Sequence, residues 1–276
     1  MTLREAAALL REAGISDAMM EARLLFSHVG GLAQSALYGS DPALDDGLIL
    51  PYVRRRAARE PMAYILGEQG FYRETYFVNR DVLIPREDTE ILVDFAVKHL
   101  SDGARFADLC TGSGCIALSV LKHTENTAAL MADISEGALS VARKNAERLS
   151  LSARAEIVSA DVLGADFHSF LFENGPWDAV LCNPPYIPED VYRTLAPEIF
   201  FEPEGAFVGA EGGMAFYRIL IPALLPCLKE GGFIAFEIGY DQAERMRALA
   251  EKNDLAAEIL SDLSGHARVA VLKKRA

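Results

Sequence analysis

The chain has 276 residues, 51% of them hydrophobic and 24% charged, with a formal net charge of −13. This length accommodates one large α/β domain and a smaller one, and an acidic body repels the phosphates that dominate nucleic-acid affinity. No apolar run approaches the ~20 residues that span a bilayer, and residues 1–14 have the pattern of an amphipathic helix rather than a signal peptide. We therefore expect a cytoplasmic protein without membrane association or stable nucleic-acid binding.

The charge is unevenly distributed, and the basic residues cluster in one place. Residues 1–75 carry 8 Lys and Arg against 10 Asp and Glu, a balance of −2, while the rest carries 19 against 30, a balance of −11. The one basic cluster consists of Arg54, Arg55, Arg56 and Arg59. A solvated helix face is the simpler interpretation, and a docking patch for an acidic or RNA-bearing partner is the alternative.

The four cysteines indicate neither disulfides nor a metal site. Cys110, Cys115, Cys182 and Cys227 form no C-x-x-C pair and have no nearby His ligand pattern. We expect reduced thiols that behave as small apolar side chains, and no bound metal.

Residues 1–70 are predicted to form a small helical domain, because apolar residues recur there at helical spacing, as in Leu3, Ala6 and Leu10. Residues 71–85 are predicted to be a β-hairpin connector, with two extended segments joined near residues 79–81. Residues 86–276 then form the second domain.

From residue 104 onward, strand and helix patterns alternate. Strands are predicted within residues 105–110, 127–134, 154–161, 177–183, 231–239, 255–263 and 267–274. Helices are predicted within residues 115–123, 135–150, about 213–228 and 241–253. This alternation indicates an α/β fold with a mostly parallel, Rossmann-like sheet covered on both faces. Because the link before the last strand is too short for a parallel crossover, the last strand should be antiparallel.

Polar or Gly-rich signals follow the first four strands of this domain, in order. They are the loop from Asp108 to Gly114, then Asp133, then Asp161, and then Asn183-Pro184-Pro185-Tyr186. Ligands of open α/β sheets bind at the carboxyl ends of the strands, and Asp133 follows Asp108 by 25 residues, near the offset of a ribose-binding carboxylate. The loop has neither a G-K-[ST] ending nor a G-x-G-x-x-G pattern. The set therefore predicts a nucleoside-containing ligand without a pyrophosphate.

The segment Asn183-Pro184-Pro185-Tyr186, called the NPPY loop below, ends an apolar strand abruptly. Proline fixes its own φ and pushes the preceding residue out of the α region. The loop should therefore be stiff and hold the Asn183 side chain and the Pro184 carbonyl in fixed directions. A plain strand-ending turn is the simpler alternative when the loop is taken alone.

These motifs together resemble the class I methyltransferases that use S-adenosylmethionine, and the NPPY form resembles the group that methylates amide or exocyclic amine nitrogens. Three stretches are further similar to the peptide chain release factor N5-glutamine methyltransferase family: EPMAYILGEQGFY (60–72), LIPREDTE (83–90) and FEPEGAF (201–207). The resemblance implies methyl transfer to the glutamine of the Gly-Gly-Gln motif of release factors, which tunes translation termination. We predict that residues 1–70 and the face around Asn183 together bind the substrate, because a near-neutral N-terminal region adjoins an acidic remainder, and we expect a monomer.

The resemblance assigns cofactor residues one by one. The methionine portion of S-adenosylmethionine would be held by one loop, which contains Asp108, Cys110, Thr111, Gly112, Ser113 and Gly114. Loss of the methyl group converts this donor to S-adenosyl-L-homocysteine. Asp133 would hold the ribose, Asp161 and Val162 would contact adenine, and Asn183 also belongs to this set. Phe71, Arg86 and Thr89 would close over the donor. Cys110 stands where the family usually has Gly, so it would be strained only if φ is positive there.

The same resemblance assigns the chemistry to the NPPY loop. The Asn183 side-chain oxygen and the Pro184 carbonyl would accept the two N–H groups of the substrate amide and direct its nitrogen at the methyl carbon. Tyr186 would pack on the amide plane, and Pro185 would complete this substrate-binding segment. For Glu202, as for Glu90, a substrate contact and a plain surface charge both stay open.

Three alternatives remain at this point. A ribosomal protein glutamine methyltransferase is a near relative, although LIPREDTE is closer to the release factor family. An N6-adenine DNA methyltransferase would use the same acceptors on a flipped base, against the charge balance. A non-catalytic nucleoside-binding module disagrees with an intact NPPY loop beside an intact Gly-rich loop.

Overall fold

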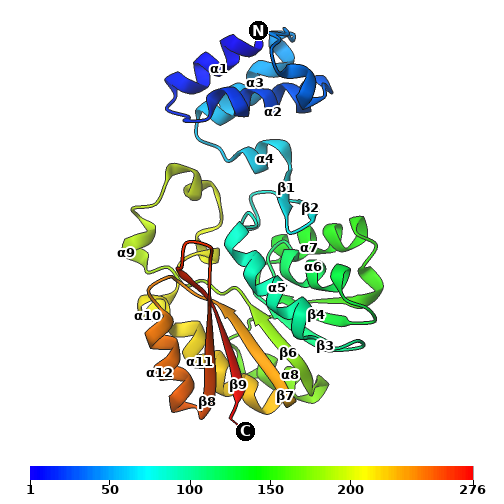
Figure 1. Ribbon diagram of the computed structural model, residues 1–276, viewed down its shortest axis with the longest axis vertical. Helices are drawn as coiled ribbons and strands as arrows, with labels where there is room; N and C mark the ends of the chain where they lie inside the picture. The colour runs from blue at the N-terminus through cyan, green and yellow to red at the C-terminus, as the bar shows by residue number, and fades with distance from the viewer. Residues whose placement is uncertain (276) are drawn as a thin grey trace. The chain divides into compact units, whose positions relative to one another are not determined.

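The computed structural model describes residues 1–275, which divide into two units (Figure 1). The helical unit consists of Met1–Glu68 together with Ala196–Phe201. The sheet unit consists of residues 69–195 and 202–275. The chain therefore passes between the two units three times, because six residues from the middle of the sequence belong to the helical unit.

The helical unit forms because its apolar residues repeat at helical spacing. Its elements are α1 (Leu3–Glu12), α2 (Ala18–Gly30), η1 (Gln34–Leu37), α3 (Asp46–Ala57), α4 (Met62–Leu66) and the 3₁₀ segment η4 (Pro197–Phe201). Thr2 caps α1: its hydroxyl accepts from the Glu5 N–H at 3.2 Å, while the Glu5 carboxylate accepts from the Thr2 N–H at 2.7 Å. Leu3, Leu10, Leu25 and other apolar residues of these helices form one buried core. The predicted helical character of this region is confirmed.

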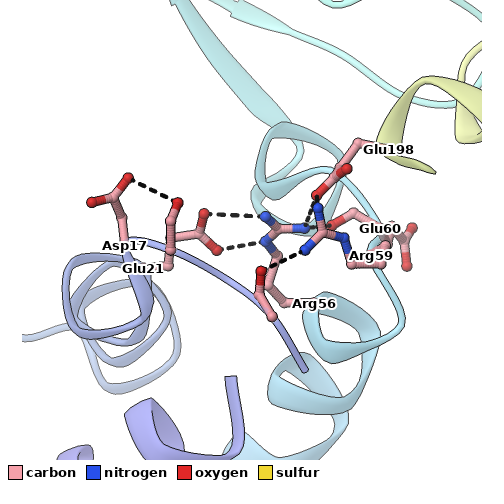
Figure 2. A network of polar contacts seen from close by, with 8 residues as sticks. Asp17, Glu21, Arg56, Arg59, Glu60 and Glu198 are labelled. Atoms are coloured by element: carbon pink, nitrogen blue, oxygen red, sulfur yellow. Dashed lines mark hydrogen bonds and ion pairs between the residues drawn. The ribbon is translucent and has the colours of Figure 1, made fainter. Parts of the chain in front are cut away.

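An ionic network centred on Arg56 joins α2, α3 and the segment Ala196–Phe201 within this unit (Figure 2). The Arg56 guanidinium donates to both carboxylate oxygens of Glu21, at 2.5 and 3.2 Å, and to Glu198 at 3.1 Å. Arg59 pairs with the same Glu198 oxygen at 2.7 Å. Burial opposes ionisation of Glu198, but hydrogen bonds from its own backbone and from Arg56 outweigh it, so the pKa of Glu198 lies below its ordinary value.

This network corrects both interpretations of the basic cluster. Arg55 makes two hydrogen bonds to Glu60, at 2.8 and 2.9 Å, and Arg56 is only 7% exposed. Arg59 also donates to the Gly14 carbonyl at 3.0 Å. Three of the four arginines are therefore paired within the helical unit, Arg56 being the buried one, and Arg54 is exposed. The sequence pattern could not show this, because the carboxylate partners Glu21 and Glu198 are distant along the chain.

A two-stranded hairpin opens the sheet unit, and its turn is not where the sequence analysis expected it. The strands are β1 (Glu68–Phe71) and β2 (Glu74–Phe77), joined by Tyr72 and Arg73, and the φ of Tyr72 is +58°. Residues 79–81 form a separate side-chain turn, in which the Asn79 amide and Asp81 exchange hydrogen bonds of 2.8 and 3.0 Å. The expectation that residues 79–81 join the two strands of the hairpin is therefore wrong, since Asn79 and Asp81 close a local turn after the second strand has ended.

The main sheet of seven strands has the order β5-β4-β3-β6-β7-β9-β8. Its strands are β3 (Arg105–Leu109), β4 (Ala128–Asp133), β5 (Ala155–Ser159), β6 (Trp177–Cys182), β7 (Leu228–Glu237), β8 (Leu255–Ser261) and β9 (Ala267–Lys274). The first five pair in parallel, and β9 runs antiparallel to both of its neighbours, β7 and β8. The predicted mostly parallel sheet with an antiparallel last strand is confirmed.

Helices cover both faces of this sheet (Figure 1). One core contains residues of α8 (Ala165–Asn174), α11 (Ala215–Leu224) and α12 (Ala243–Lys252). The other contains residues of α5 (Glu90–His99), α6 (Cys115–His123) and α7 (Glu136–Arg148). Successive residues of β3 alternate between them: Phe106 belongs to the second core, and Ala107 and Leu109 to the first. The short elements of the unit are η2 (Glu87–Thr89), η3 (Ser152–Arg154), α9 (Glu189–Tyr192), η5 (Glu204–Ala206), α10 (Ala210–Gly213) and η6 (Leu225–Cys227).

Two helices, α5 and α8, were not among the predicted elements. Their sequences, EILVDFAVKH and ADFHSFLFEN, are rich in aromatic and β-branched residues, which have weak intrinsic helix propensity. Packing against the sheet stabilises them instead. No helix within residues 1–275 is long and apolar enough to cross a membrane.

Replacing Arg56 by Ala should destabilise the helical unit by about 3 kcal/mol, because it leaves Glu21 and Glu198 without their shared cation in a poorly hydrated site. Hydrogen exchange in α2, α3 and Ala196–Phe201 should become roughly 100-fold faster. The exposed neighbour Arg54, replaced by Ala, is the control. Equal protection in both variants would show that the network is not needed for the stability of the unit.

Candidate active site

The loop between β3 and α6 forms the floor of the site. Gly112 and Gly114 have φ values of +54° and +80°, and a Cβ on Gly114 would lie 2.7 Å from the Met131 side chain. The loop is closed by hydrogen bonds from the Thr111 N–H to the Ala132 carbonyl, at 3.0 Å, and from the Gly114 N–H to the Thr111 carbonyl, at 2.8 Å. Glycine is required at position 114 by both the backbone conformation and the space.

Cys110, which stands where the resembling family has Gly, has a φ of +57°. The backbone of Cys110 is therefore strained, because a side chain in the left-handed region costs about 1–2 kcal/mol. Its thiol is half-buried and packs against the core that contains Cys182. Local packing therefore holds a conformation that the residue itself disfavours.

Asp133 at the end of β4 connects the loops of the site. One of its carboxylate oxygens accepts from the Gly112 N–H at 2.9 Å, and the other accepts from the Ser135 N–H at 3.0 Å. Ser135 in turn caps α7 by accepting from the Ala138 N–H at 3.2 Å. These bonds fix the carboxylate and leave lone pairs for a ligand.

Asp108 is fully buried beneath the loop and is incompletely paired. Its Oδ2 accepts from the Thr111 hydroxyl at 2.6 Å and from the Ala117 N–H at 3.3 Å. Its Oδ1 is buried and has no hydrogen-bond partner among residues 1–275. Burial raises the pKa of Asp108 to about 7. A buried carboxylate oxygen without a partner fits a cationic group of a ligand, which would stabilise the ionised form.

A cavity of about 380 Å³ lies above this loop, in the size range of small-molecule sites. Ten predicted cofactor-binding residues line it: Cys110, Thr111, Gly112, Ser113, Asp133, Asp161, Val162, Asn183, Arg86 and Thr89. Pro185, predicted to bind substrate, also lines it. The carboxyl ends of β3, β4, β5 and β6 therefore contribute to one hollow. Further lining comes from Asp81, Ile134, Pro203, Ala206 and Phe216, which the sequence analysis did not single out.

Asn183 is the polar group of the NPPY loop at this cavity. It follows Cys182, which pairs with Leu109 of β3 and with Phe236 of β7. The side chain is half-buried, and none of the described residues makes a hydrogen bond to it. An amide held at the end of a central strand without an internal partner is available to a ligand.

The remaining predicted site residues do not line the cavity. Asp108 lies beneath the loop and Gly114 caps α6, while Pro184 is buried. Phe71 is 3% exposed, in edge-to-face contact with Tyr76. The Tyr186 hydroxyl donates to Glu237 at 3.0 Å. The predicted roles of these residues stay predictions.

Glu202 is a structural carboxylate in this unit, so the surface-charge interpretation is wrong for it. Its side chain is 1% exposed, accepts from the Ile84 N–H at 2.8 Å and pairs with Arg86. Because Arg86 lines the cavity, Glu202 fixes one wall of the site. The Glu90 carboxylate also has a partner within the unit, since it accepts from the Tyr72 N–H at 2.6 Å.

Two buried groups that the sequence analysis missed hold the loops of the site. Asn145 of α7, 1% exposed, donates to the Ser113 carbonyl at 2.9 Å and also bonds both backbone groups of Phe77. Glu237, at the end of β7, contacts the NPPY loop through Tyr186, and burial raises its pKa. The sequence held a signal for both residues: Asn145 is an amide on the apolar face of a predicted helix, and Glu237 is a carboxylate within an apolar predicted strand.

Within residues 1–275, no group of three or more His, Cys, Asp or Glu side chains is arranged to hold a metal ion. The site consists of the Gly-rich loop, the carboxylates of Asp133 and Asp161 at two strand ends, and the Asn183 amide, to which none of the described residues makes a hydrogen bond.

Solved structures that share this architecture include methyltransferases. The chain resembles the hMettl16 catalytic domain with a TM-score of 0.56 and 15% identity, over 73% of this chain and 76% of that one. It resembles the ribosomal protein L11 methylase of Lactobacillus delbrueckii subsp. bulgaricus with a TM-score of 0.50 and 18% identity, over 72% and 84%. The sheet order and its helices thus define the class I methyltransferase fold.

Family models and sequence relatives narrow this class. The Methyltransferase small domain matches residues 87–215, and the PrmC N-terminal domain matches residues 2–67. The chain is 39% identical to a release factor glutamine methyltransferase of Caulobacter vibrioides, over 94% of this chain and 91% of the relative. It is 37% identical to one of Rhodospirillum rubrum, over 97% and 82%. The chain belongs to the release factor glutamine methyltransferase family.

The raised pKa of Asp108 predicts a pH-dependent stability. Between its ordinary value near 4 and its folded pKa of about 7, the native state holds a proton that the unfolded chain has lost, so stability falls as pH rises through this window. From pH 5 to pH 7 this contribution should fall by roughly 2 kcal/mol. Urea unfolding followed by the fluorescence of Trp177, the single tryptophan, measures it in the sheet unit.

The Asp108→Asn variant should lose this contribution, so that its stability falls less than that of the wild type over the same range. Asp166→Asn, at an exposed position of α8, is the control and should keep the wild-type profile. Identical profiles for the wild type and Asp108→Asn would contradict the raised pKa.

Proposed function

We propose that this chain transfers a methyl group from S-adenosylmethionine to the side-chain amide nitrogen of a glutamine, the one in the Gly-Gly-Gln motif of peptide chain release factors. The observation that carries the proposal is the Asn183 side chain, which lies at the cavity without an internal hydrogen bond. The names of the relatives from Caulobacter vibrioides and Rhodospirillum rubrum support the same substrate class.

The residues of the cavity fit the donor. Gly112 and its neighbours line the cavity with backbone that a ligand can approach closely, Asp133 presents a fixed carboxylate, and Val162 presents a buried apolar surface. In the proposed arrangement the loop Cys110–Gly114 holds the methionine portion, Asp133 the ribose hydroxyls, and Asp161 with Val162 the adenine. The unpaired Oδ1 of Asp108 suits a nearby ammonium group. Bound there, S-adenosylmethionine supplies a methyl carbon already activated by its sulfonium.

The protein's contribution to the reaction is orientation. A glutamine amide nitrogen is a poor nucleophile because its lone pair is delocalised into the carbonyl. The Asn183 side-chain oxygen and the Pro184 carbonyl would accept its two N–H groups and oppose the positive charge that develops on nitrogen. The new N–C bond forms as the S–C bond breaks, S-adenosyl-L-homocysteine leaves, and the extra amide proton passes to water. Fixed geometry contributes up to about 7–11 kcal/mol, and each hydrogen bond to the developing charge adds ~1.5–3 kcal/mol.

Replacing Asn183 by Ala should lower kcat by about 10²–10³-fold, because one acceptor for the developing charge is lost. The measurement uses methyl-labelled S-adenosylmethionine with three acceptors in parallel: a release factor, the same factor with its Gly-Gly-Gln glutamine replaced, and duplex DNA. Asn174→Ala, at an exposed position of α8, is the matched control.

Label on the unmodified release factor alone would establish both the reaction and its site. Label on DNA would mean that the NPPY loop performs methyl transfer on a different acceptor. With no label on any acceptor, the release factor proposal fails, and a ribosomal protein becomes the next acceptor to test.

We also propose that the helical unit recognises the release factor. The N-terminal 75 residues are near neutral while the remainder is strongly acidic, and Leu9, Met20, Tyr38 and Leu48 expose large apolar side chains on this unit. Monomeric behaviour and the absence of stable nucleic-acid binding stay predictions.

Replacing both Met20 and Leu48 by Ser should raise KM for the release factor without changing kcat, because both side chains are exposed and remote in sequence from the NPPY loop. Steady-state methylation at saturating donor measures this. Phe172→Ser, an equally exposed apolar position on α8, is the control. An unchanged KM in the double variant would contradict this docking role.

A further inference from the structure

The far side of the NPPY loop is held by two buried polar side chains that no part of the proposed chemistry uses. The Tyr186 hydroxyl donates to Glu237 Oε1 at 3.0 Å, and the Gln242 amide nitrogen donates to the Tyr186 carbonyl at 3.1 Å. Glu237 is 3% exposed and Gln242 is 1% exposed. The Tyr186 side chain is therefore bonded to the last residue of β7, and its backbone is bonded to the residue just before α12.

The orientation of the Gln242 amide is determined by its partners. Its oxygen accepts from the Gly239 N–H at 2.9 Å and from the Tyr217 hydroxyl at 3.3 Å. The Tyr186 carbonyl can only accept and the Gly239 N–H can only donate, so the nitrogen must face Tyr186. Tyr217 is fully buried, and its single hydroxyl proton is shared between the Gln242 oxygen and the Glu237 carbonyl, which is the nearer acceptor at 2.8 Å. Glu237 and Gln242 thus belong to one connected network.

The backbone packs closely behind the same loop. A Cβ on Gly213 would lie 1.9 Å from the Tyr186 carbonyl oxygen, and one on Gly209 would lie 2.4 Å from the Pro185 carbonyl oxygen. The next residue, Ile187, donates to the Phe207 carbonyl at 2.8 Å and accepts from the Gly209 N–H at 2.9 Å. The loop therefore has no space to retreat from the cavity, and it is held after Tyr186 as well as before Asn183.

We propose that Glu237 and Gln242 are positioning residues that hold the NPPY loop so that the Asn183 side chain and the Pro184 carbonyl meet the substrate amide in a fixed geometry. This inference rests on the proposed function, because it concerns the same reaction. Asn183 lies three residues before Tyr186, with two prolines between them. Each proline fixes its own φ and restricts the residue before it, so a displacement at Tyr186 is transmitted to Asn183 rather than absorbed.

The variants Glu237→Leu, Gln242→Leu and Tyr186→Phe should each lower kcat by about 10- to 100-fold, the effect of a displacement near 1 Å in an oriented site. The KM for the release factor and the dissociation constant of S-adenosylmethionine should stay within about twofold of wild type, since neither Glu237 nor Gln242 lines the cavity. Glu237→Gln should retain most of the activity, because its amide oxygen still accepts from the Tyr186 hydroxyl. The control is Glu230→Gln, an exposed position on the same strand, β7.

Because Tyr186→Phe and Glu237→Leu remove the same hydrogen bond, their double variant should be no slower than the slower of the two single variants. Unchanged kcat in Glu237→Leu and Gln242→Leu would overturn the proposal. Loss of donor affinity and of melting temperature in parallel with kcat would also overturn it, because both residues would then be general supports of the fold.

A second measurement is independent of the acceptor. Tyrosine labelled with carbon-13 gives ring signals, and the one absent in Tyr186→Phe belongs to Tyr186. This signal should shift in Glu237→Leu and in Gln242→Leu, and stay in place in Glu230→Gln. If the wild type does not methylate a release factor, the proposed function fails, whereas an unshifted Tyr186 signal shows that the two residues do not hold the loop.

Discussion

The parallel pairing of β3 with β4 and with β6 is the constraint on which the rest of the site depends. Parallel strands end at the same edge of a sheet, so the Gly-rich loop after β3, Asp133 after β4 and Asn183 after β6 must lie near one another. Their separations along the chain do not matter once the strands pair. The cavity is the space that remains between these strand ends, and the helices on both faces keep it at one edge.

Four buried polar side chains of the sheet unit are of two kinds. Asn145 and Gln242 have their amides occupied by backbone partners and hold loops in place. Asp108 and Glu237 each retain one buried oxygen without a partner among residues 1–275. A buried oxygen without a partner is costly in folding, so the stability of the fold does not explain why these two positions carry carboxylates. The positive φ of Cys110, in the loop that follows β3, adds a further cost to folding.

Much of this architecture could be predicted from the sequence, because strand and helix patterns are local. Residues 115–123 were predicted as a helix, and α6 has those bounds. The antiparallel last strand followed from the shortness of one link. The hairpin turn was misplaced because Asn79 and Asp81 imitate a hairpin turn locally, and α8 was missed because its aromatic residues are weak helix formers. Both errors concern segments whose local preference differs from the structure that packing imposes.

The sequence by itself determined the order of the elements and the residues that end each strand, since these depend on neighbours a few positions apart. The tertiary structure alone decided which distant groups meet. Tyr186 meets Glu237 across 51 residues, Ser113 meets Asn145 across 32, and Arg56 meets Glu198 across 142. Such pairs depend on strand order and on the packing of whole elements. A charged residue in the sequence therefore does not reveal whether it will contact solvent, a ligand or a partner from another part of the chain.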